Sequence, residues 1–290
     1  MSFDPLALQF LLIWSVFLAG SGVILFLIGR LKKRNLVSRI LAWFPIIVSI
    51  FLSIHLGKWV FFVFILAVFA ASHWELSRLV QNIGILHHVI ALGLALPWLI
   101  LIQFHEISIW ALPSILFFLC PFLYLALFMK QKHWRQIFPF ALMLGAGFSL
   151  WILLGRSGGF RLVIFVFSVT ALNDMTAFFF GTVFGGRRPF PRLSPNKTLA
   201  GYLGGILSAV LAAHVFRFAV PELNAVSVTL AGIVLAIAGS LGDLLASKIK
   251  RIHNVKDFSS MMGAMGGVFD RCDSLLPSAW IASIFFLYFL

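Results

Sequence analysis

Long apolar runs recur along the whole chain, and they restrict its fold more than any other feature. Ten runs of 15 to 24 residues can be outlined, close to the roughly 20 residues that a helix needs to cross a bilayer core. They are too long and too continuous for the strands of a membrane barrel, so we expect an all-α polytopic membrane protein. The predicted spans are residues 6–29, 40–56, 59–73, 88–104, 109–128, 137–155, 161–184, 199–219, 227–247 and 274–290.

Composition supports this fold class and narrows the function. Hydrophobic residues make up 61% of the chain and charged residues 11%, which excludes a soluble globular domain. In a membrane protein, the net charge of +13 indicates orientation and contact with anionic lipids rather than with nucleic acid. The first run follows "MSFDPLALQ", which carries no positive charge, so we interpret it as a retained span and not as a signal peptide. The third run is short, which leaves open a tight hairpin with the second around "HLGKW".

Lysine and arginine are distributed unevenly between the predicted loops. With the N-terminus outside, 18 of the 22 fall on the cytoplasmic side, which is a strong orientation signal under the positive-inside rule. We therefore expect the polar motifs described below to face the cytoplasm. A small basic chain without a targeting segment fits a bacterial inner membrane. The predicted cytoplasmic loops are residues 30–39, 74–87, 129–136, 185–198 and 248–273.

Polar residues are also uneven along the chain. The interhelical segments before residue 160 are short and plain, whereas the chain from 170 onward is dense in Asn, Asp, Lys, Arg and Gly. No linker rich in Pro, Gly or Ser separates the two halves. We predict one integral membrane domain, in which residues 1–160 form a scaffold open to dimer contacts and residues 161–290 carry the catalytic groups.

The run at 161–184 contains two adjacent polar residues, Asn173 and Asp174. A carboxylate inside a membrane helix is costly unless it is paired or bound to a cation, which makes Asp174 a candidate functional residue. The alternative is a polar residue that bonds to a neighbouring helix. A single Asp in a span does not decide between them.

The segment "GGRRPFPRLSPNKTLAGYLGG" (185–205) places three arginines and Lys197 beside the next span. Ser194 followed by Pro195 has the form of a helix start, with Ser as N-cap and Pro at the first helical position. Residues 196–198 would then form the first turn, where free N–H groups and a lysine are suited to phosphate. The alternative is a basic loop that only anchors the chain at the membrane surface.

The run at 227–247 ends in "GSLGDLLASKIKR". If the helix continues, Asp243, Ser247, Lys250 and Arg251 share one face. An inward acid followed by a hydroxyl and two cations could hold a metal ion together with a phosphate chain. The alternative is an ordinary Asp–Lys arrangement whose basic end reaches the membrane surface.

The stretch "MGGVFDRCDS" (265–274) precedes the last apolar run. If 268–274 begins the last helix, Asp270 and Asp273 project to the same side and can share divalent ions. The oxygen ligands favour Mg²⁺, whereas Cys272 suits packing better than such a metal. The neighbouring Gly263, Gly266 and Gly267 leave room for a nucleotide to approach the backbone.

Together these stretches resemble one family, the integral-membrane phosphatidate cytidylyltransferases, or CDP-diacylglycerol synthases. The resemblance covers roughly residues 170–275, and "WELSRL" (74–79) is similar to a further feature of the family. All spacings of the family's C-terminal signature are kept. The matching positions are Asn173-Asp174, Ser194 to Thr198, Gly242-Asp243, Ser247, Lys250-Arg251, Lys256-Asp257, Gly266-Gly267 and Asp270-Arg271-x-Asp273.

Two departures from the family pattern matter most. Met265 stands where the family has a histidine, and Leu199-Ala200 stands where it has Trp-Glu. Cys272 also replaces an aliphatic residue. These changes leave open a different lipid phosphate, slow turnover or a non-catalytic homologue that binds lipid or nucleotide. The acidic positions are all retained, which favours an active enzyme.

The resemblance implies Mg²⁺-dependent transfer of a cytidylyl group from CTP to a lipid phosphate of the inner leaflet, most simply phosphatidate. It also implies a homodimer, and it leaves open a second cation. It assigns catalysis to Asp243, Asp270, Asp273, Lys250 and Arg251, and metal binding to the same three acids with Asp174. It assigns substrate binding to Asn173, Asp174, Ser194, Asn196, Lys197, Thr198, Ser247, Lys256, Asp257, Gly266, Gly267 and Arg271.

Two other classes fit the sequence less well. An anion transporter more often shows internal repeats and broken helices in both halves, whereas polarity is concentrated here in one half. A phosphotransferase that consumes CDP-lipids normally carries four Asp in one compact motif, which is absent from this sequence.

Overall fold

The computed structural model describes residues 5–27, 43–79, 159–191, 193–262 and 266–290. Within these ranges every regular element is a helix and no strand is present, which confirms the all-α prediction for this part of the chain. The chain divides into two compact units. The first unit comprises residues 1–75 and 257–270, and the second comprises residues 76–256 and 271–290.

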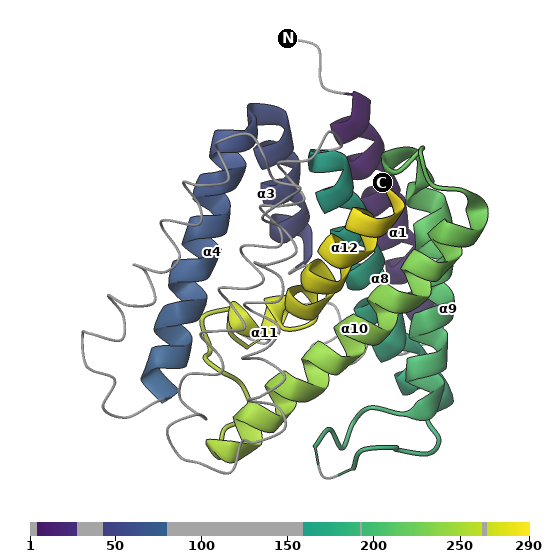
Figure 1. Cartoon of the computed structure of the whole chain (residues 1–290). Coiled ribbons are helices and arrows are strands. Elements are labelled where there is room, and N and C mark those ends of the chain that lie inside the picture. The colour runs from purple at the N-terminus through teal and green to yellow at the C-terminus, as the bar shows by residue number, and fades with distance from the viewer. Residues whose placement is uncertain (1–4, 28–42, 80–158, 192, 263–265) are drawn as a thin grey trace. The chain divides into compact units, whose positions relative to one another are not determined.

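The second unit contains three helices that are long and apolar enough to cross a membrane (Figure 1). Two are α8 (Phe160–Phe184) and α10 (Ala225–Ile252). The third, residues 199–219, consists of α9 (Leu199–Val215) and the short 3₁₀-helix η2 (Phe216–Ala219). These helices confirm the predicted spans 161–184, 199–219 and 227–247, and the last continues five residues further.

Other predicted spans have different outcomes. Helices α1 (Pro5–Leu27), α3 (Trp43–Leu56) and α12 (Leu275–Phe289) cover the described parts of the first, second and tenth. The spans predicted at 88–104, 109–128 and 137–155 lie outside the described residues. The count of ten, the external N-terminus and the division of roles at residue 160 remain predictions.

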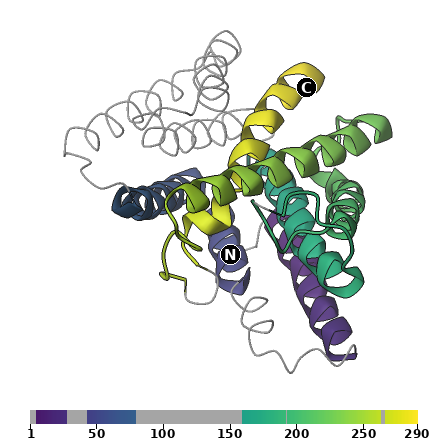
Figure 2. The ribbon, with the colours of Figure 1, turned by 90° about the horizontal axis from the view of Figure 1, so that it is seen from below.

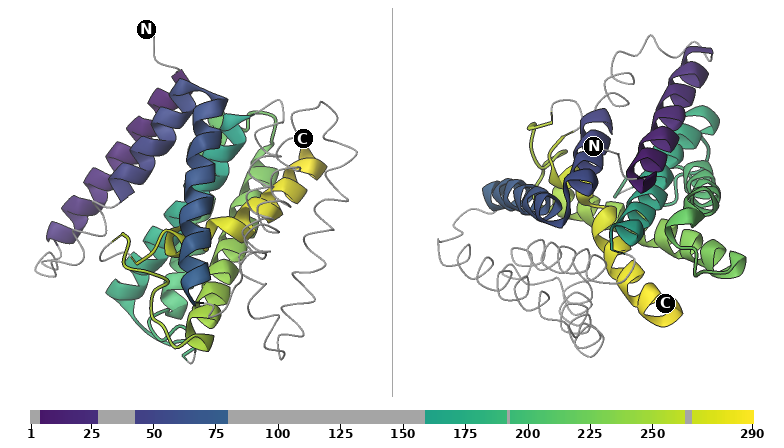
Figure 3. Two further views of the ribbon diagram at one scale, coloured as in Figure 1. Left: turned by 90° about the vertical axis from the view of Figure 1, so that its left-hand side faces the viewer. Right: turned by 90° about the horizontal axis from the view of Figure 1, so that it is seen from above.

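The first unit contains α1, α3 and most of α4 (Lys58–Leu79), and α1 packs against α3 (Figure 3). Gly57 alone separates α3 from α4. Its φ of 106° suits glycine, and its carbonyl accepts the N–H groups of Val60 and Phe61 at 3.1 and 3.2 Å. Helix α4 covers the third predicted span, 59–73, and continues six residues beyond it to Leu79. The polar residues there ended the apolar run, but one of them, Glu75, is fully buried.

Close helix contacts in the second unit depend on small residues. Helix α9 lies against α8 (Figures 1 and 2), and a Cβ added at Gly204 would stand 2.4 Å from the Phe180 ring. A Cβ at Gly205 would stand 2.7 Å from Asn173 Oδ1. Membrane helices associate through such close packing, since lipid is as apolar as the helices themselves. The glycines therefore bring α9 close to the polar residues of α8.

The C-terminal segment begins with a break. Helix α11 (Phe269–Cys272) is only four residues long, and α12 starts after Asp273 and Ser274. The prediction that 268–274 begins the last helix is therefore wrong. Pro277 gives the reason, because a proline ring clashes with the carbonyl of the residue four positions earlier, here Asp273. That carbonyl packs over Gly242 of α10, where an added Cβ would lie 2.3 Å from it.

Candidate active site

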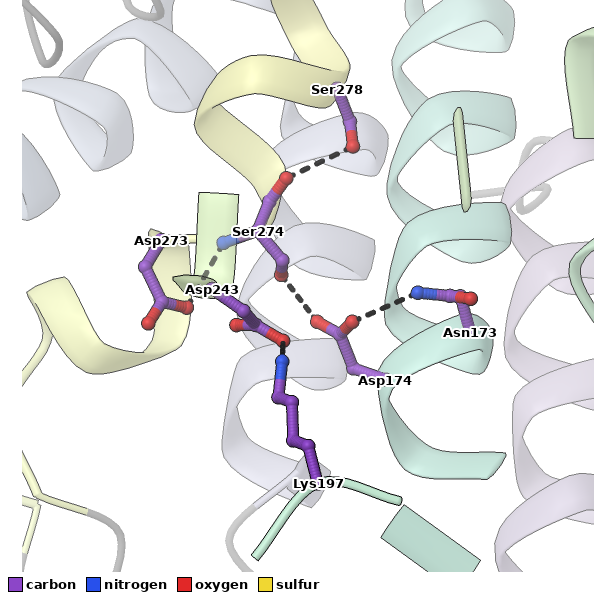
Figure 4. Close-up of polar contacts among 7 residues, drawn as sticks. All are labelled: Asn173, Asp174, Lys197, Asp243, Asp273, Ser274 and Ser278. Atoms are coloured by element: carbon purple, nitrogen blue, oxygen red, sulfur yellow. Dashed lines mark hydrogen bonds and ion pairs between the residues drawn. The ribbon is translucent and has the colours of Figure 1, made fainter. Parts of the chain in front are cut away.

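Three carboxylates from separate parts of the second unit form what we call the carboxylate cluster: Asp174 on α8, Asp243 on α10, and Asp273 between α11 and α12. In the view of Figure 4 the Asp243 carboxylate lies between the other two. Each acid acts on the others electrostatically. Helices that are far apart in sequence thus bring three negative groups together in a largely buried setting.

Ser274 holds two of these acids in place, one through its hydroxyl and one through its backbone N–H. Asp174 accepts a hydrogen bond from Asn173 Nδ2 at 3.1 Å and another from the hydroxyl of Ser274. The backbone N–H of Ser274 donates to Asp273 Oδ1 at 2.9 Å, so one residue links both acids (Figure 4). Ser278 Oγ donates to the Ser274 carbonyl at 2.9 Å. Ser274 and Ser278 were not among the predicted site residues, and only their position after Asp273 could have indicated them.

Lys197 supplies the positive charge that contacts the cluster. Its ammonium group forms an ion pair with Asp243 (Figure 4) and lies 5.8 Å from the centre of the Tyr202 ring. Burial is the largest single influence and would lower the pKa of Lys197, but the Asp243 and Asp174 carboxylates together with the contact to Asp243 outweigh it, and the pKa is raised. Lys197 therefore stays charged and offsets one of the three carboxylates.

The segment before α9 differs from the predicted helix start. Ser194 does not cap a helix: its carbonyl accepts the N–H of Lys197 at 3.3 Å, as in a β-turn with Pro195 at its second position. Helix α9 begins at Leu199, and the Thr198 hydroxyl caps it by accepting the N–H of Gly201 at 3.2 Å. Ser-Pro suits both a β-turn and a helix start, so this dipeptide alone does not show where a helix begins. In the structure Ser194 and Pro195 form a turn, and Thr198 is the N-cap.

Helix α10 continues to Ile252. This confirms the condition for the predicted shared face, which requires one continuous helix through Asp243, Ser247, Lys250 and Arg251. Asp243 contacts Lys197, while Arg251 is exposed. Lys250 lies near enough to Asp273 to act on it electrostatically. Burial raises the pKa of Asp273 well above its usual range and Asp243 raises it further, while Lys250 and Arg271 oppose the shift.

The cluster has the donor chemistry of a divalent cation site. Its three acids are hard oxygen ligands of the kind Mg²⁺ takes, and the mutual repulsion of buried carboxylates favours a bound cation. Among the residues that the structure describes, however, no three His, Cys, Asp or Glu side chains are already gathered at metal-binding distances. The predicted Mg²⁺ therefore stays a prediction, and so does a second cation.

The remaining predicted acid, Asp270, belongs to the first unit. Its Oδ2 accepts the N–H groups of Phe258 and Gly267 at 2.9 and 2.8 Å. An added Cβ at Gly266 would stand 2.7 Å from the same oxygen, and φ at Gly266 is +83°. Gly266 therefore makes room for the Asp270 carboxylate, a role that differs from the predicted one of leaving space for a nucleotide. The predicted sharing of a cation between Asp270 and Asp273 stays a prediction.

Other predicted residues have simpler outcomes. Lys256 and Asp257 are exposed, and Asn196 is exposed in the turn before α9. Gly263 and Met265 lie outside the described residues. Ala200, at the position of the family's glutamate, is half-buried in the first turn of α9.

Glu75 was not predicted as a site residue and lies within the segment "WELSRL" (74–79). Its side chain is fully buried in the first unit and accepts hydrogen bonds from Ser259, Val268 and Phe269. A carboxylate at the end of an apolar run was the signal that could have marked it.

Comparison with known proteins agrees with these features. A sequence profile of the Cytidylyltransferase family matches residues 37–289, and the chain belongs to this family. A phosphatidate cytidylyltransferase of Staphylococcus epidermidis is 39% identical over 122 residues, 42% of this chain and 47% of the relative. One from Brucella abortus is 36% identical over 151 residues, 51% and 56% of the two chains. An uncharacterized Escherichia coli protein, YnbB, is 36% identical over 131 residues, 45% and 44%.

The chain thus matches about half the length of these curated relatives. Membership of the family is shown by the profile, which matches most of the chain. Apolar helices together with these relatives also identify an integral membrane protein.

Proposed function

We propose that this chain transfers a cytidylyl group from CTP to the phosphate of a membrane lipid, with phosphatidate as the first candidate. The products would be CDP-diacylglycerol and pyrophosphate. The observation that carries the proposal is the partly buried carboxylate cluster with Lys197 paired to Asp243, in a chain of the Cytidylyltransferase family. Relatives that bear the name phosphatidate cytidylyltransferase support the choice of lipid.

The proposed reaction does not require a strong general base. An oxygen of the lipid phosphate forms a bond to the α-phosphorus of CTP, while the bond from that phosphorus to the pyrophosphate oxygen breaks. The attacking oxygen already carries negative charge, so no residue has to remove a proton. The barrier comes from bringing two anions together in line, which positioning and charge neutralisation lower.

We assign the polar residues singled out in the sequence to these two tasks. Asp174, Asp243 and Asp273 would hold Mg²⁺, with Asp270 as a proposed fourth ligand. When bound, the ion would neutralise phosphate charge and align the displacement. Lys197, Lys250, Arg251 and Arg271 would bind phosphate oxygens of the nucleotide and the lipid. The remaining proposed substrate contacts are Asn173, Ser194, Asn196, Thr198, Ser247, Lys256, Asp257, Gly266 and Gly267.

The membrane setting is part of the proposal. We place the N-terminus outside and the site at the cytoplasmic side of a bacterial inner membrane, where CTP is available and the lipid enters from the inner leaflet. The excess of basic residues in the predicted cytoplasmic loops supports this orientation. The full set of ten spans and a homodimer are proposed with it.

A second candidate follows from two substituted positions. Ala200 offers no polar group where the family has a glutamate, and Met265 replaces the family's histidine. A chain that lacks both groups could accept another lipid phosphate, or bind nucleotide and lipid without turnover.

The test is pyrophosphate release by the purified full-length chain in detergent, with CTP, Mg²⁺ and a panel of lipid phosphates. We expect release with phosphatidate and none from Asp273→Asn. Release only with another lipid would replace phosphatidate as the substrate. No release with any lipid, while CTP still binds, would support the non-catalytic alternative.

A further inference from the structure

Glu75 is the most completely buried charged residue described, with no exposed side-chain area. It lies on α4 in the first unit, more than 180 residues before the backbone that it contacts. A carboxylate is expensive to bury unless its oxygens accept hydrogen bonds. The contacts of Glu75 therefore explain why this position tolerates an acid.

Both carboxylate oxygens of Glu75 accept hydrogen bonds. Oε1 accepts the Ser259 hydroxyl at 2.6 Å and the N–H of Val268 at 2.8 Å, and Oε2 accepts the N–H of Phe269 at 2.9 Å. Two successive backbone N–H groups directed at one anion form a strong, specific contact. A glutamine could not reproduce it, because its amide nitrogen would face a donor.

The contact of Glu75 with the backbone depends on the absence of a side chain at Gly267. A Cβ added there would stand 2.5 Å from Glu75 Oε2 and 2.7 Å from both Cδ and Oε1. These separations are far below van der Waals contact, so any side chain at 267 would push the carboxylate away. Glycine at this position is required for Glu75 to reach the backbone.

The same backbone is held from a second direction by Asp270, whose Oδ2 accepts the N–H of Gly267. The rings of Phe258 and Phe269 meet edge to face, with their centres 4.7 Å apart. Donors at positions 267, 268 and 269 are thus divided between Asp270 and Glu75. The position of Asp270 depends on a backbone that Glu75 fixes.

We infer that Glu75 is a positioning residue for the proposed cytidylyl transfer. It acts by fixing the backbone of residues 267–269, from which Asp270 follows directly and Asp273 three residues later. The inference rests on the proposed function, since Asp270 and Asp273 matter here as groups of that reaction. As a positioning residue, Glu75 itself would contact neither the substrate nor the ion.

The first test compares Glu75→Gln with Glu222→Gln, the same substitution at an exposed acid, in the full-length chain in detergent. We expect amide hydrogen exchange in residues 266–270 to become about tenfold faster in Glu75→Gln, because one hydrogen bond is lost. Exchange in α9 and α10 should not change. The value of kcat should fall and the Mg²⁺ concentration for half-maximal rate should rise, with an unchanged KM for the lipid.

The second test does not need Glu75→Gln to fold well. Gly267→Ala should disturb the same contact from the other side, and Glu75→Asp should make room for the added methyl group. The double variant should therefore recover slower exchange and higher kcat than Gly267→Ala alone, a non-additive effect expected of direct neighbours.

The possible failures are distinguishable. Unchanged exchange in Glu75→Gln, strictly additive effects in the double variant, or faster exchange with kcat and Mg²⁺ dependence unchanged would each overturn the positioning role. Absence of pyrophosphate release from the unaltered chain would instead count against the proposed function.

Discussion

Two groups of acidic residues in this protein have opposite surroundings. In the carboxylate cluster, Asp174, Asp243 and Asp273 repel one another and Lys197 pairs with one of them. In the first unit, Glu75 and Asp270 accept backbone N–H groups. Both groups are at least partly buried, but the acids of the cluster act on one another and on Lys197, whereas Glu75 and Asp270 accept backbone donors. The comparison teaches that burial of an acid does not identify its role, whereas the kind of partner does.

The largest effect is expected from Asp273→Asn. An amide cannot replace a charged ligand, so we expect pyrophosphate release to fall by about a thousandfold or more. Thermal stability should be kept or raised, because the substitution removes repulsion within the cluster. Activity and melting temperature measured on one preparation check both parts. A variant that keeps its activity would remove Asp273 from the site, and Glu222→Gln, at an exposed acid outside the proposed site, is the control.

Asp270→Asn tests whether Asp270 only accepts backbone N–H groups or also binds metal like the acids of the cluster. The asparagine carbonyl can still accept the N–H groups of Phe258 and Gly267, so the fold of the segment should survive. If Asp270 is also a metal ligand, activity should fall ten- to hundredfold and more Mg²⁺ should be needed. Titration of the rate with Mg²⁺ measures this. A rate that stays near that of the unaltered chain would make Asp270 purely structural.

Lys197→Gln removes the cation that pairs with Asp243 in the cluster. We expect the KM for CTP to rise about tenfold or more, since a charged contact to phosphate is lost. The melting temperature without Mg²⁺ should fall, because Asp243 is left uncompensated. Arg188→Gln, in the exposed part of the same loop, is the matched control. Equal effects of the two substitutions would show that only the charge of the loop matters.

The smallest effect concerns the helix start before the cluster. Thr198→Ala should cost about 1 kcal/mol of stability, because the cap of α9 is lost. Ser194→Ala should cost less, since the turn uses the Ser194 carbonyl and not its hydroxyl. Chemical denaturation in detergent compares the two. The opposite order would restore Ser194 as the cap.

Local patterns of the sequence were sufficient for several features. The apolar runs placed α8, α9 and α10, and helical periodicity placed Asp243 and Lys250 on one helix, because both depend on neighbours within a few turns. Local signals failed where two short motifs competed, as at Ser194 and Thr198. They also did not mark Glu75, a fully buried acid that lies on α4 beyond the apolar run.

The sequence by itself therefore determined the helical membrane class, the family likeness and the choice of Asp174, Asp243 and Asp273 as candidates. Only the tertiary structure decided which groups partner them. Ser274 contacts Asp174 across 100 residues and Glu75 contacts Phe269 across 194, and no periodicity connects such positions. The physical reason is that a buried carboxylate is defined by the donors around it, and chain folding alone brings those donors to it.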